Sequence, residues 1–246
     1  MKRTVDSLSL LEKQVAAWGY HLDRSRRQGL LAYARLLATY DRANVIGTRD
    51  LHGILLAHVL DSLSCFLYRP LFGATRLADV GSGGGLPGIP ISIVKPDLAA
   101  TLVESTGKKA SFLRHAVESL SLENVEVANV RVEELGREQG CRGAYDIVTS
   151  RAVARLSVVV EYGVPLLETG GRVLAMKGRL EQEELAEGSR AADALGARVV
   201  EIVEVSMLPE IGEKERKLVI VEKVQETHPR YPRRSGVAAR KPLGAG

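Results

Sequence analysis

A glycine-rich segment, DVGSGGGLPG at residues 79–88, contains the residue types that most directly suggest ligand binding. It lies between an apolar segment typical of a strand and an apolar segment typical of a helix. Glycines let the backbone approach a ligand where a Cβ atom would collide, and Pro87 favours the start of a helix. The segment therefore predicts a ligand-binding turn, with candidate binding residues Asp79, Gly81, Gly83, Gly85 and Leu86.

The spacing of the glycines separates this turn from two common phosphate-binding turns. A dinucleotide-binding turn has glycines at its first, third and sixth positions, but the sixth position counted from Gly81 is Leu86. The Gly-Lys-Ser/Thr ending of a P-loop is also missing. The pattern favours a ligand without a pyrophosphate, such as S-adenosylmethionine, which has an adenosine end and an amino-acid end.

An acidic residue near the end of the next apolar segment supports the same ligand. Glu104 stands where a carboxylate would accept hydrogen bonds from ribose hydroxyls, about 20 residues after the turn. Either feature alone is weak, because glycine-rich turns also join strands to helices for purely structural reasons. Together they favour a methyltransferase.

Alternating apolar and amphipathic segments after Pro70 predict βα units around a parallel sheet. We expect strands at 76–80, 100–104, 125–129, 146–149 and 172–176, with helices at 86–94, 108–120, 132–138 and 156–167. Two further apolar segments, 199–205 and 217–224, are joined by a segment too short for a parallel crossover, so we expect them to be antiparallel and to close one edge of the sheet.

These elements predict an α/β fold of the class I S-adenosylmethionine-dependent methyltransferase type. Its Rossmann-like sheet would have seven mostly parallel strands with one antiparallel edge strand. Apolar residues at helical spacing, such as Leu8, Leu11 and Val15, predict a helical N-terminal region. We therefore divide the chain into an N-terminal helical cap at 1–72, a methyltransferase domain at 73–225 and a basic C-terminal tail at 226–246.

Charge is concentrated in the tail. It carries five basic side chains and one acidic side chain, a net charge of +4 that equals that of all 246 residues. Mobile guanidinium groups in such a tail would contact the phosphates of a nucleic acid. A solvated basic terminus explains the charge equally well.

Composition indicates the compartment. The two cysteines, Cys65 and Cys141, lack the spacing of metal ligands or of a disulfide framework. The N-terminus has no uninterrupted apolar segment typical of a signal peptide, and the most apolar long segment, 51–67, is broken by charged and histidine residues. We expect a cytoplasmic protein without a membrane segment or bound metal, and a monomer by default.

Several segments, taken in order, resemble the RsmG (GidB) family. They are NVI at 44–46, HVLDSL at 58–63, DVGSGGGLPGIP at 79–90, VESTGKKASFL at 103–113, RVEEL at 131–135, SRAVARL at 150–156, GGRVLAMKG at 170–178 and YPRRSGVAARKPL at 231–243. The resemblance covers residues 44–243. It implies methylation of guanine N7 in the decoding-region (530) loop of 16S ribosomal RNA, free or within the small subunit.

The resemblance also implies site residues. Near the cofactor it places Gly81 and Leu86 at the turn, Glu104, Ser105 and Thr106 by the ribose and adenine, and Val132 and Glu133 by the adenine. The acid is Glu104 where many relatives have aspartate. Arg151 would lie between cofactor and RNA as the catalytic residue, and the candidate RNA contacts are Lys108, Lys177, Arg230, Arg233 and Arg234.

Each of these roles has a structural alternative. Arg151 could pair with a carboxylate such as Glu133, Lys177 could only end a strand, and Lys108 could lie on a solvated helix face. His58 and Asp61, three residues apart on one helical face, are more typical of a core histidine with its partner than of a catalytic pair.

The residues after the fourth strand narrow the reaction. Enzymes that methylate exocyclic amines resemble one another in an Asn/Asp-Pro-Pro-aromatic motif there, whereas this chain has Thr149-Ser150-Arg151-Ala152. Methylation of pyrimidine carbon 5 resembles cysteine chemistry, and neither cysteine ends a predicted strand. Both observations favour a ring nitrogen, whose lone pair needs no deprotonation, so that positioning can carry catalysis.

Two other functions are compatible with the sequence. One is a class I methyltransferase acting on a small molecule or a protein, which would have no need of the basic tail. The other is a non-catalytic ribosome-associated RNA-binding module, which would give no heat in a titration with S-adenosylmethionine. Sequence alone predicts that a chain ending at Gln225 keeps its cofactor affinity and loses RNA methylation.

Overall fold

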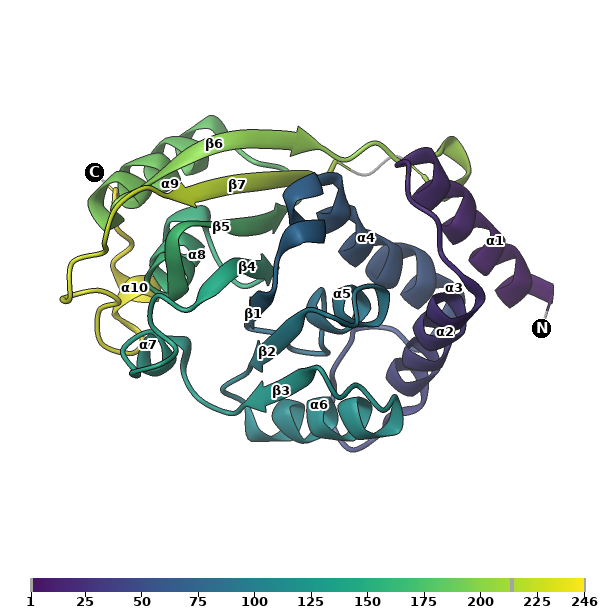
Figure 1. Ribbon diagram of the computed structural model, residues 1–246. Coiled ribbons are helices and arrows are strands. Elements are labelled where there is room, and N and C mark those ends of the chain that lie inside the picture. Colours follow the sequence, from purple (N-terminus) through teal and green to yellow (C-terminus); the bar gives the residue numbers. More distant parts are fainter. Residues whose placement is uncertain (1, 213–214, 246) are drawn as a thin grey trace.

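A seven-stranded sheet with helices on both faces forms the centre of the computed structural model, which describes residues 2–212 and 215–245 (Figure 1). The strand order is β3-β2-β1-β4-β5-β7-β6. Strands β1 to β5 pair in parallel, and β7 is antiparallel to both β5 and β6. The predicted mostly parallel sheet, closed at one edge by an antiparallel pair, is confirmed.

The strands have the bounds Arg76–Val80 (β1), Ala99–Val103 (β2), Val125–Ala128 (β3), Tyr145–Arg151 (β4), Leu167–Lys177 (β5), Ala197–Glu204 (β6) and Lys217–Lys223 (β7). The helices around the sheet are Gly88–Val94 (α5), Gly107–Ser119 (α6), Val132–Leu135 (α7), Leu156–Gly163 (α8), Gln182–Leu195 (α9) and the short Val237–Arg240 (α10). Strand β5 begins five residues earlier than predicted, because its start pairs with Tyr145 across a register shift.

Helix α9 has no counterpart among the predicted elements. Its buried face includes Gly188, Ala191 and Ala192, which are too small to give a strong apolar periodicity. Small residues are required there because a Cβ atom at Gly188 would lie 2.4 Å from the side chain of Leu156 on α8. The helix ends at Gly196 in the left-handed conformation, a common helix terminator.

The N-terminal region is helical, as predicted. Its helices are Lys2–Ala17 (α1), Arg24–Thr39 (α2), Leu51–Ile54 (α3) and Leu60–Leu63 (α4), with a π-helical turn at Leu55–Val59 between the last two and 3₁₀ turns at Ser64–Leu67 and Arg69–Gly73. Buried residues of α1 and α2 share one hydrophobic core with the sheet residues Leu77, Leu102 and Leu174. The cap is therefore packed on the sheet through a common core.

The cap also contacts the glycine turn directly. The buried Tyr33 hydroxyl of α2 donates a hydrogen bond to the Gly84 carbonyl. A Cβ atom at Gly84 would lie 2.8 Å from the Val45 carbonyl oxygen and 3.2 Å from the Leu37 side chain. These contacts fix the position of residues 37–45 relative to the turn.

None of the helices within residues 2–212 and 215–245 has both the length and the apolar character needed to span a membrane.

Candidate functional site

The carboxylate of Asp79 holds the glycine turn in place. It is fully buried at the end of β1, and its Oδ1 accepts a hydrogen bond from the Thr149 hydroxyl of β4 at 2.9 Å. Its Oδ2 accepts one from the Gly88 backbone N–H, at the start of α5, at 3.1 Å. Asp79, predicted to bind the cofactor, therefore lies behind the turn and joins two strands and a helix.

The three alternate glycines of the turn have left-handed backbones but different surroundings. A Cβ atom at Gly81 would lie 2.6 Å from the Val153 side chain, and one at Gly85 would lie 2.4 Å from Ile89. At Gly83 the nearest atom is the Gly81 carbonyl oxygen at 3.8 Å. Gly81 and Gly85 are thus required by packing, whereas Gly83 borders open space that a ligand can use.

Glu104 follows β2 and spans the turn from the other side. Its Oε2 accepts a hydrogen bond from the Gly83 N–H at 3.0 Å, and its Oε1 accepts one from the Thr106 N–H at 2.7 Å. Each carboxylate oxygen has a second lone pair, so the carboxylate can also accept hydrogen bonds from a diol. Glu104, the acid that the spacing predicted, thus contacts the glycine turn.

A cavity of about 170 Å³ opens between the turn, Glu104 and α7. Its lining combines apolar valine side chains with the carboxylates of Glu104 and Glu133, an arrangement suited to an adenosine. The lining residues are Val80, Gly81, Val103, Glu104, Ser105, Val130, Arg131, Val132, Glu133, Val153 and Tyr162. We call it the turn cavity.

The turn cavity brings together five of the eleven predicted cofactor residues, and its lining leaves out Asp79, Gly83, Gly85, Leu86, Thr106 and Arg151. Ser105, Val132 and Glu133 line it, whereas Thr106 lies outside the lining and begins α6 with its N–H on Glu104. Sequence reasoning missed Tyr162, which comes from α8, 81 residues after Gly81. Val153 could have been found from its place in the SRAVARL segment. The sequence of α8 gives no indication that Tyr162 faces the turn cavity.

Arg151, at the end of β4, lines a second cavity of about 460 Å³, which we call the arginine cavity. Its Nη1 lies 3.2 Å from Oδ2 of Asp61, and its Nη2 lies 3.3 Å from Nδ1 of His58. The other oxygen of Asp61 pairs with Nε of Arg216 at 2.5 Å. The carboxylate partner of Arg151 is therefore Asp61 and not Glu133, the partner suggested from sequence.

The placement of this cluster rests on irregular backbone. His58 lies in the π-helical turn, a feature that often occurs at functional sites. Ala152, directly after Arg151, has a φ of 54°, which is unusual for a residue with a Cβ atom and is held only where the surroundings demand it. The unusual backbone conformation of Ala152 thus helps to fix the position of the Arg151 side chain.

Lys177, predicted to contact RNA, supports the segment after Arg151. Its ammonium donates a hydrogen bond to the Ala154 carbonyl at 2.9 Å and lies 2.6 Å from Oε1 of Glu184. Its side chain is 14% exposed at the wall of the arginine cavity. In the structure Lys177 is therefore paired within the protein and does not project into solvent.

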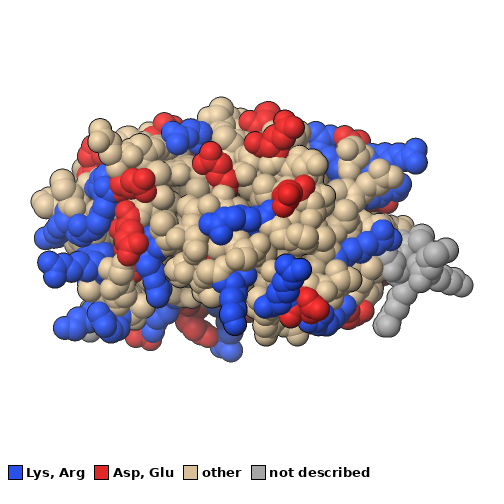
Figure 2. Space-filling view, turned by 90° about the horizontal axis from the view of Figure 1, so that it is seen from below, with Lys and Arg blue, Asp and Glu red and all other residues tan. Residues whose placement is uncertain are grey.

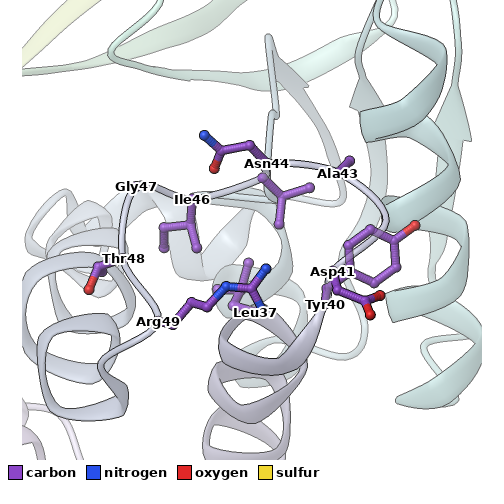
Figure 3. Close-up of a pocket in the computed structure, with 10 residues that line it drawn as sticks. Leu37, Tyr40, Asp41, Ala43, Asn44, Ile46, Gly47, Thr48 and Arg49 are labelled. Atoms are coloured by element: carbon purple, nitrogen blue, oxygen red, sulfur yellow. The ribbon is translucent and has the colours of Figure 1, made fainter.

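A third hollow, of about 380 Å³, lies under the segment that joins α2 to α3. Figure 3 shows this segment arching from the end of α2, with Ile46 and Arg49 pointing beneath the arch and Asn44 on its other side. The hollow borders the glycine turn, because Leu37 and Val45 contact Gly84. The NVI motif therefore lies close to the turn, a position that its sequence pattern did not predict.

Basic side chains are spread over the face seen in Figure 2 and gather at its left end, where Figure 1 places α7 and α10. Lys108 is exposed in the first turn of α6, and Arg230 and Arg234 are exposed in the tail. Arg233 differs: its guanidinium pairs with the fully buried carboxylate of Glu161 at 2.5 Å. The tail is also packed against α7 and α8, which corrects the picture of a tail with mobile arginines.

Burial of Asp79 predicts a pH dependence of stability. Desolvation raises the pKa of this carboxyl from 3.8 to about 6, although hydrogen bonds from Thr149 and Gly88 act in the opposite direction. Because the folded state holds the proton more tightly than the unfolded state, protonation of Asp79 stabilises the fold. This contribution to the unfolding free energy is complete below pH 4 and is lost as pH rises through 6. The unfolding free energy of the wild type should fall relative to Asp79→Asn by about 2 kcal/mol between pH 4 and pH 7.

Chemical denaturation across that range measures the difference. Asp146→Asn is the matched control: despite partial burial, hydrogen bonds from Thr75 and Arg76 lower the pKa of Asp146. The stability that Asp146 contributes is lost only below this range, as pH falls through the lowered pKa, so the wild type and this control variant should give nearly parallel curves between pH 4 and pH 7. Parallel curves for the wild type and Asp79→Asn would contradict the assignment of a proton to Asp79.

Comparison with known proteins identifies the family. The model of the family described as rRNA small subunit methyltransferase G (GidB) matches residues 26–219. The "Ribosomal RNA small subunit methyltransferase G" of Rubrobacter xylanophilus is 55% identical over 95% of this chain and 90% of its own length. The protein of the same name from Chloroflexus aggregans is 44% identical over 95% of this chain and 97% of its own.

Solved structures share the fold at low identity. Mitomycin 7-O-methyltransferase MmcR has a TM-score of 0.54 at 15% identity, over 72% of this chain and 56% of its own. The StiE O-MT has a TM-score of 0.52, also at 15% identity, over 69% of this chain and 75% of its own. The fold is therefore that of S-adenosylmethionine-dependent methyltransferases, and the chain belongs to the rRNA small subunit methyltransferase G family.

Proposed function

We propose that this protein transfers a methyl group from S-adenosylmethionine to N7 of a guanine in the decoding-region (530) loop of 16S ribosomal RNA. Its relatives are ribosomal RNA small subunit methyltransferases, which makes methyl transfer to small-subunit RNA the activity of the family. The choice of guanine N7 and of the loop comes from the resemblance described above. We further propose that the protein acts as a cytoplasmic monomer.

The turn cavity fits the cofactor. Gly83, beside the cavity but outside its lining, leaves room for close backbone approach, and the carboxylate of Glu104 in the lining is available to a ribose diol. Valine side chains at 103 and 132 offer apolar surfaces to an adenine ring. When bound, S-adenosylmethionine supplies an electrophilic methyl group on a sulfonium. The protein's task is then to hold the nucleophile in line with that group and to exclude water.

Methyl transfer to guanine N7 needs no base catalyst. Its lone pair lies in the ring plane, so no proton has to be removed before transfer. Cys65 is buried in the cap, where desolvation raises the pKa of its thiol, and Cys141 lies before β4. Neither thiol is at the carboxyl end of a strand, where a covalent nucleophile would be needed.

The observation that carries the proposal is the anchored Arg151 in the arginine cavity, two residues before Val153, which lines the turn cavity. The guanidinium presents a planar set of donors, which suits the O6 of guanine or a flanking phosphate. Asp61 and His58 hold two of its nitrogens, so the group is positioned before RNA binds. We propose Arg151 as the catalytic residue that orients the base against the cofactor.

The RNA contacts follow from exposure. We propose that Lys108, Arg230 and Arg234 contact phosphates, because their side chains are exposed. Lys177 and Arg233 stay candidates from the sequence, but their cationic groups already bind Glu184 and Glu161. Lys177 would contribute to RNA binding by holding the segment around Ala154, and Arg233 by holding the C-terminal tail.

Mapping the modified base tests the function. Ribosomal RNA from cells lacking this protein should contain unmodified guanine in the 530 loop, and the wild-type chain should restore N7-methylguanosine, as measured by mass spectrometry of nuclease fragments. Arg151→Gln should lower methylation in vitro by about 100-fold or more, because a preorganised donor is lost. Arg24→Gln, which removes an exposed arginine of the cap, is the matched control.

Two results would contradict the proposal. One is a full complement of N7-methylguanosine in the 530 loop without the protein. The other is a modification that the wild-type chain restores on a different base or atom.

The open space at Gly83, next to the turn cavity, gives a separate prediction for cofactor binding. Gly83→Asp should abolish binding of S-adenosylmethionine in calorimetric titration, since the new side chain would fill the open space and repel the ligand's partner Glu104. Gly140→Asp is the control, because Gly140 is also left-handed and a Cβ atom there would have no neighbour within 4 Å. Normal binding by a folded Gly83→Asp protein would show that the ligand lies elsewhere.

A further inference from the structure

The C-terminal tail is attached to the body of the protein by arginines that come from the body. Arg137 Nη2 donates a hydrogen bond to the Pro232 carbonyl at 2.6 Å, and Arg142 Nη1 donates one to the Tyr231 carbonyl at 2.6 Å. Pro232 packs on Gly136, where a Cβ atom would lie 3.0 Å from the proline ring. Figure 1 shows the tail, in yellow, beside α7. These contacts are all with the segment that directly follows α7, one wall of the turn cavity.

One tail side chain reaches a buried acid of α8. Glu161 is fully buried, and its Oε1 accepts hydrogen bonds from Arg233 Nε at 2.8 Å and from the Arg233 backbone N–H at 3.0 Å. Its Oε2 accepts one from Arg233 Nη2 at 2.5 Å. A buried carboxylate is costly without such partners, so this pair fixes α8 against the tail. The next residue of α8, Tyr162, lines the turn cavity.

A second tail contact reaches the cavity wall itself. The Gly236 backbone N–H donates a hydrogen bond to Oε1 of Glu133 at 2.7 Å. Glu133 is buried and lines the turn cavity, as Glu104 does. It also lies beside the Tyr162 hydroxyl, and burial together with this carboxylate raises the pKa of Tyr162 to about 12. The tail therefore holds two polar groups of the wall, Glu133 directly and Tyr162 through Glu161.

We propose that the C-terminal tail completes the cofactor site, with Arg233 and Glu161 as positioning residues for the wall that contacts the adenine. This inference rests on the placement of S-adenosylmethionine in the turn cavity. The tail then acts on cofactor affinity, in addition to any contact that its exposed arginines make with RNA. A chain ending at Gln225 should therefore lose cofactor affinity, the opposite of the expectation from sequence alone.

The experiment compares the full-length wild type with Arg233→Gln and Arg233→Lys. Arg233→Lys keeps a cation opposite Glu161, and so protects folding, but one ammonium cannot replace the two-pronged guanidinium. Titration calorimetry with S-adenosylmethionine, at a temperature where circular dichroism shows each variant fully folded, should give a Kd about tenfold higher for Arg233→Gln and a smaller increase for Arg233→Lys. Arg240→Gln, an equal loss of charge at an exposed tail position, should bind as the wild type does.

A role in stability alone would lower the melting temperature without changing the Kd of the folded protein. Equal Kd values for the wild type and both Arg233 variants would therefore overturn the inference. Loss of RNA affinity with unchanged cofactor affinity would also overturn it, in favour of a tail that contacts only RNA. A wild type that does not bind S-adenosylmethionine would instead refute the placement of the cofactor, which is a separate failure.

Discussion

The fully buried carboxylate of Asp79 is the constraint on which the rest of the site depends. It joins β1 to β4 through Thr149 and to the start of α5 through the Gly88 N–H. A charged group in this place would be unfavourable unless both oxygens were bonded, so the three elements can meet in only one arrangement. The glycine turn is the part of the chain that lies between these bonds, and its shape follows from them.

Three other carboxylates near the site also join separate segments through hydrogen bonds or ion pairs. Glu104 binds the Gly83 N–H from the side of β2, Asp61 bridges Arg151 and Arg216, and Glu161 binds Arg233. Each carboxylate joins segments that are distant in sequence. The two cavities are therefore walled by groups that are already bonded before a ligand arrives, and such preorganisation is what a reaction governed by positioning requires.

Much of the fold can be predicted from the sequence. The strand at 76–80 is predicted to the residue, because an apolar segment ends there at an unmistakable turn. The spacing of Gly81 to Gly85 and the acid at 104 predict the cofactor side of the site, since both belong to short local segments. Helix α9 is not predictable by the same means, because its buried face is made of small residues that fit against Leu156.

The partners of the charged residues could not be predicted. A count of charges makes Arg233 look solvated, because nothing local shows that Glu161, 72 residues away, is buried beside it. Arg151 likewise finds Asp61 from the cap, 90 residues earlier, and not the nearer Glu133. Such pairings depend on how the cap and the tail pack on the sheet, which is a property of the whole fold.

A crystal structure of the protein with S-adenosylmethionine tests the central claim most directly. We expect the adenosine to lie in the turn cavity, with the ribose hydroxyls on the Glu104 carboxylate, the adenine against Val132 and the backbone of Gly83 in contact with the ligand. Density for the compound in another cavity, or in the turn cavity without contact to Glu104, would contradict this placement.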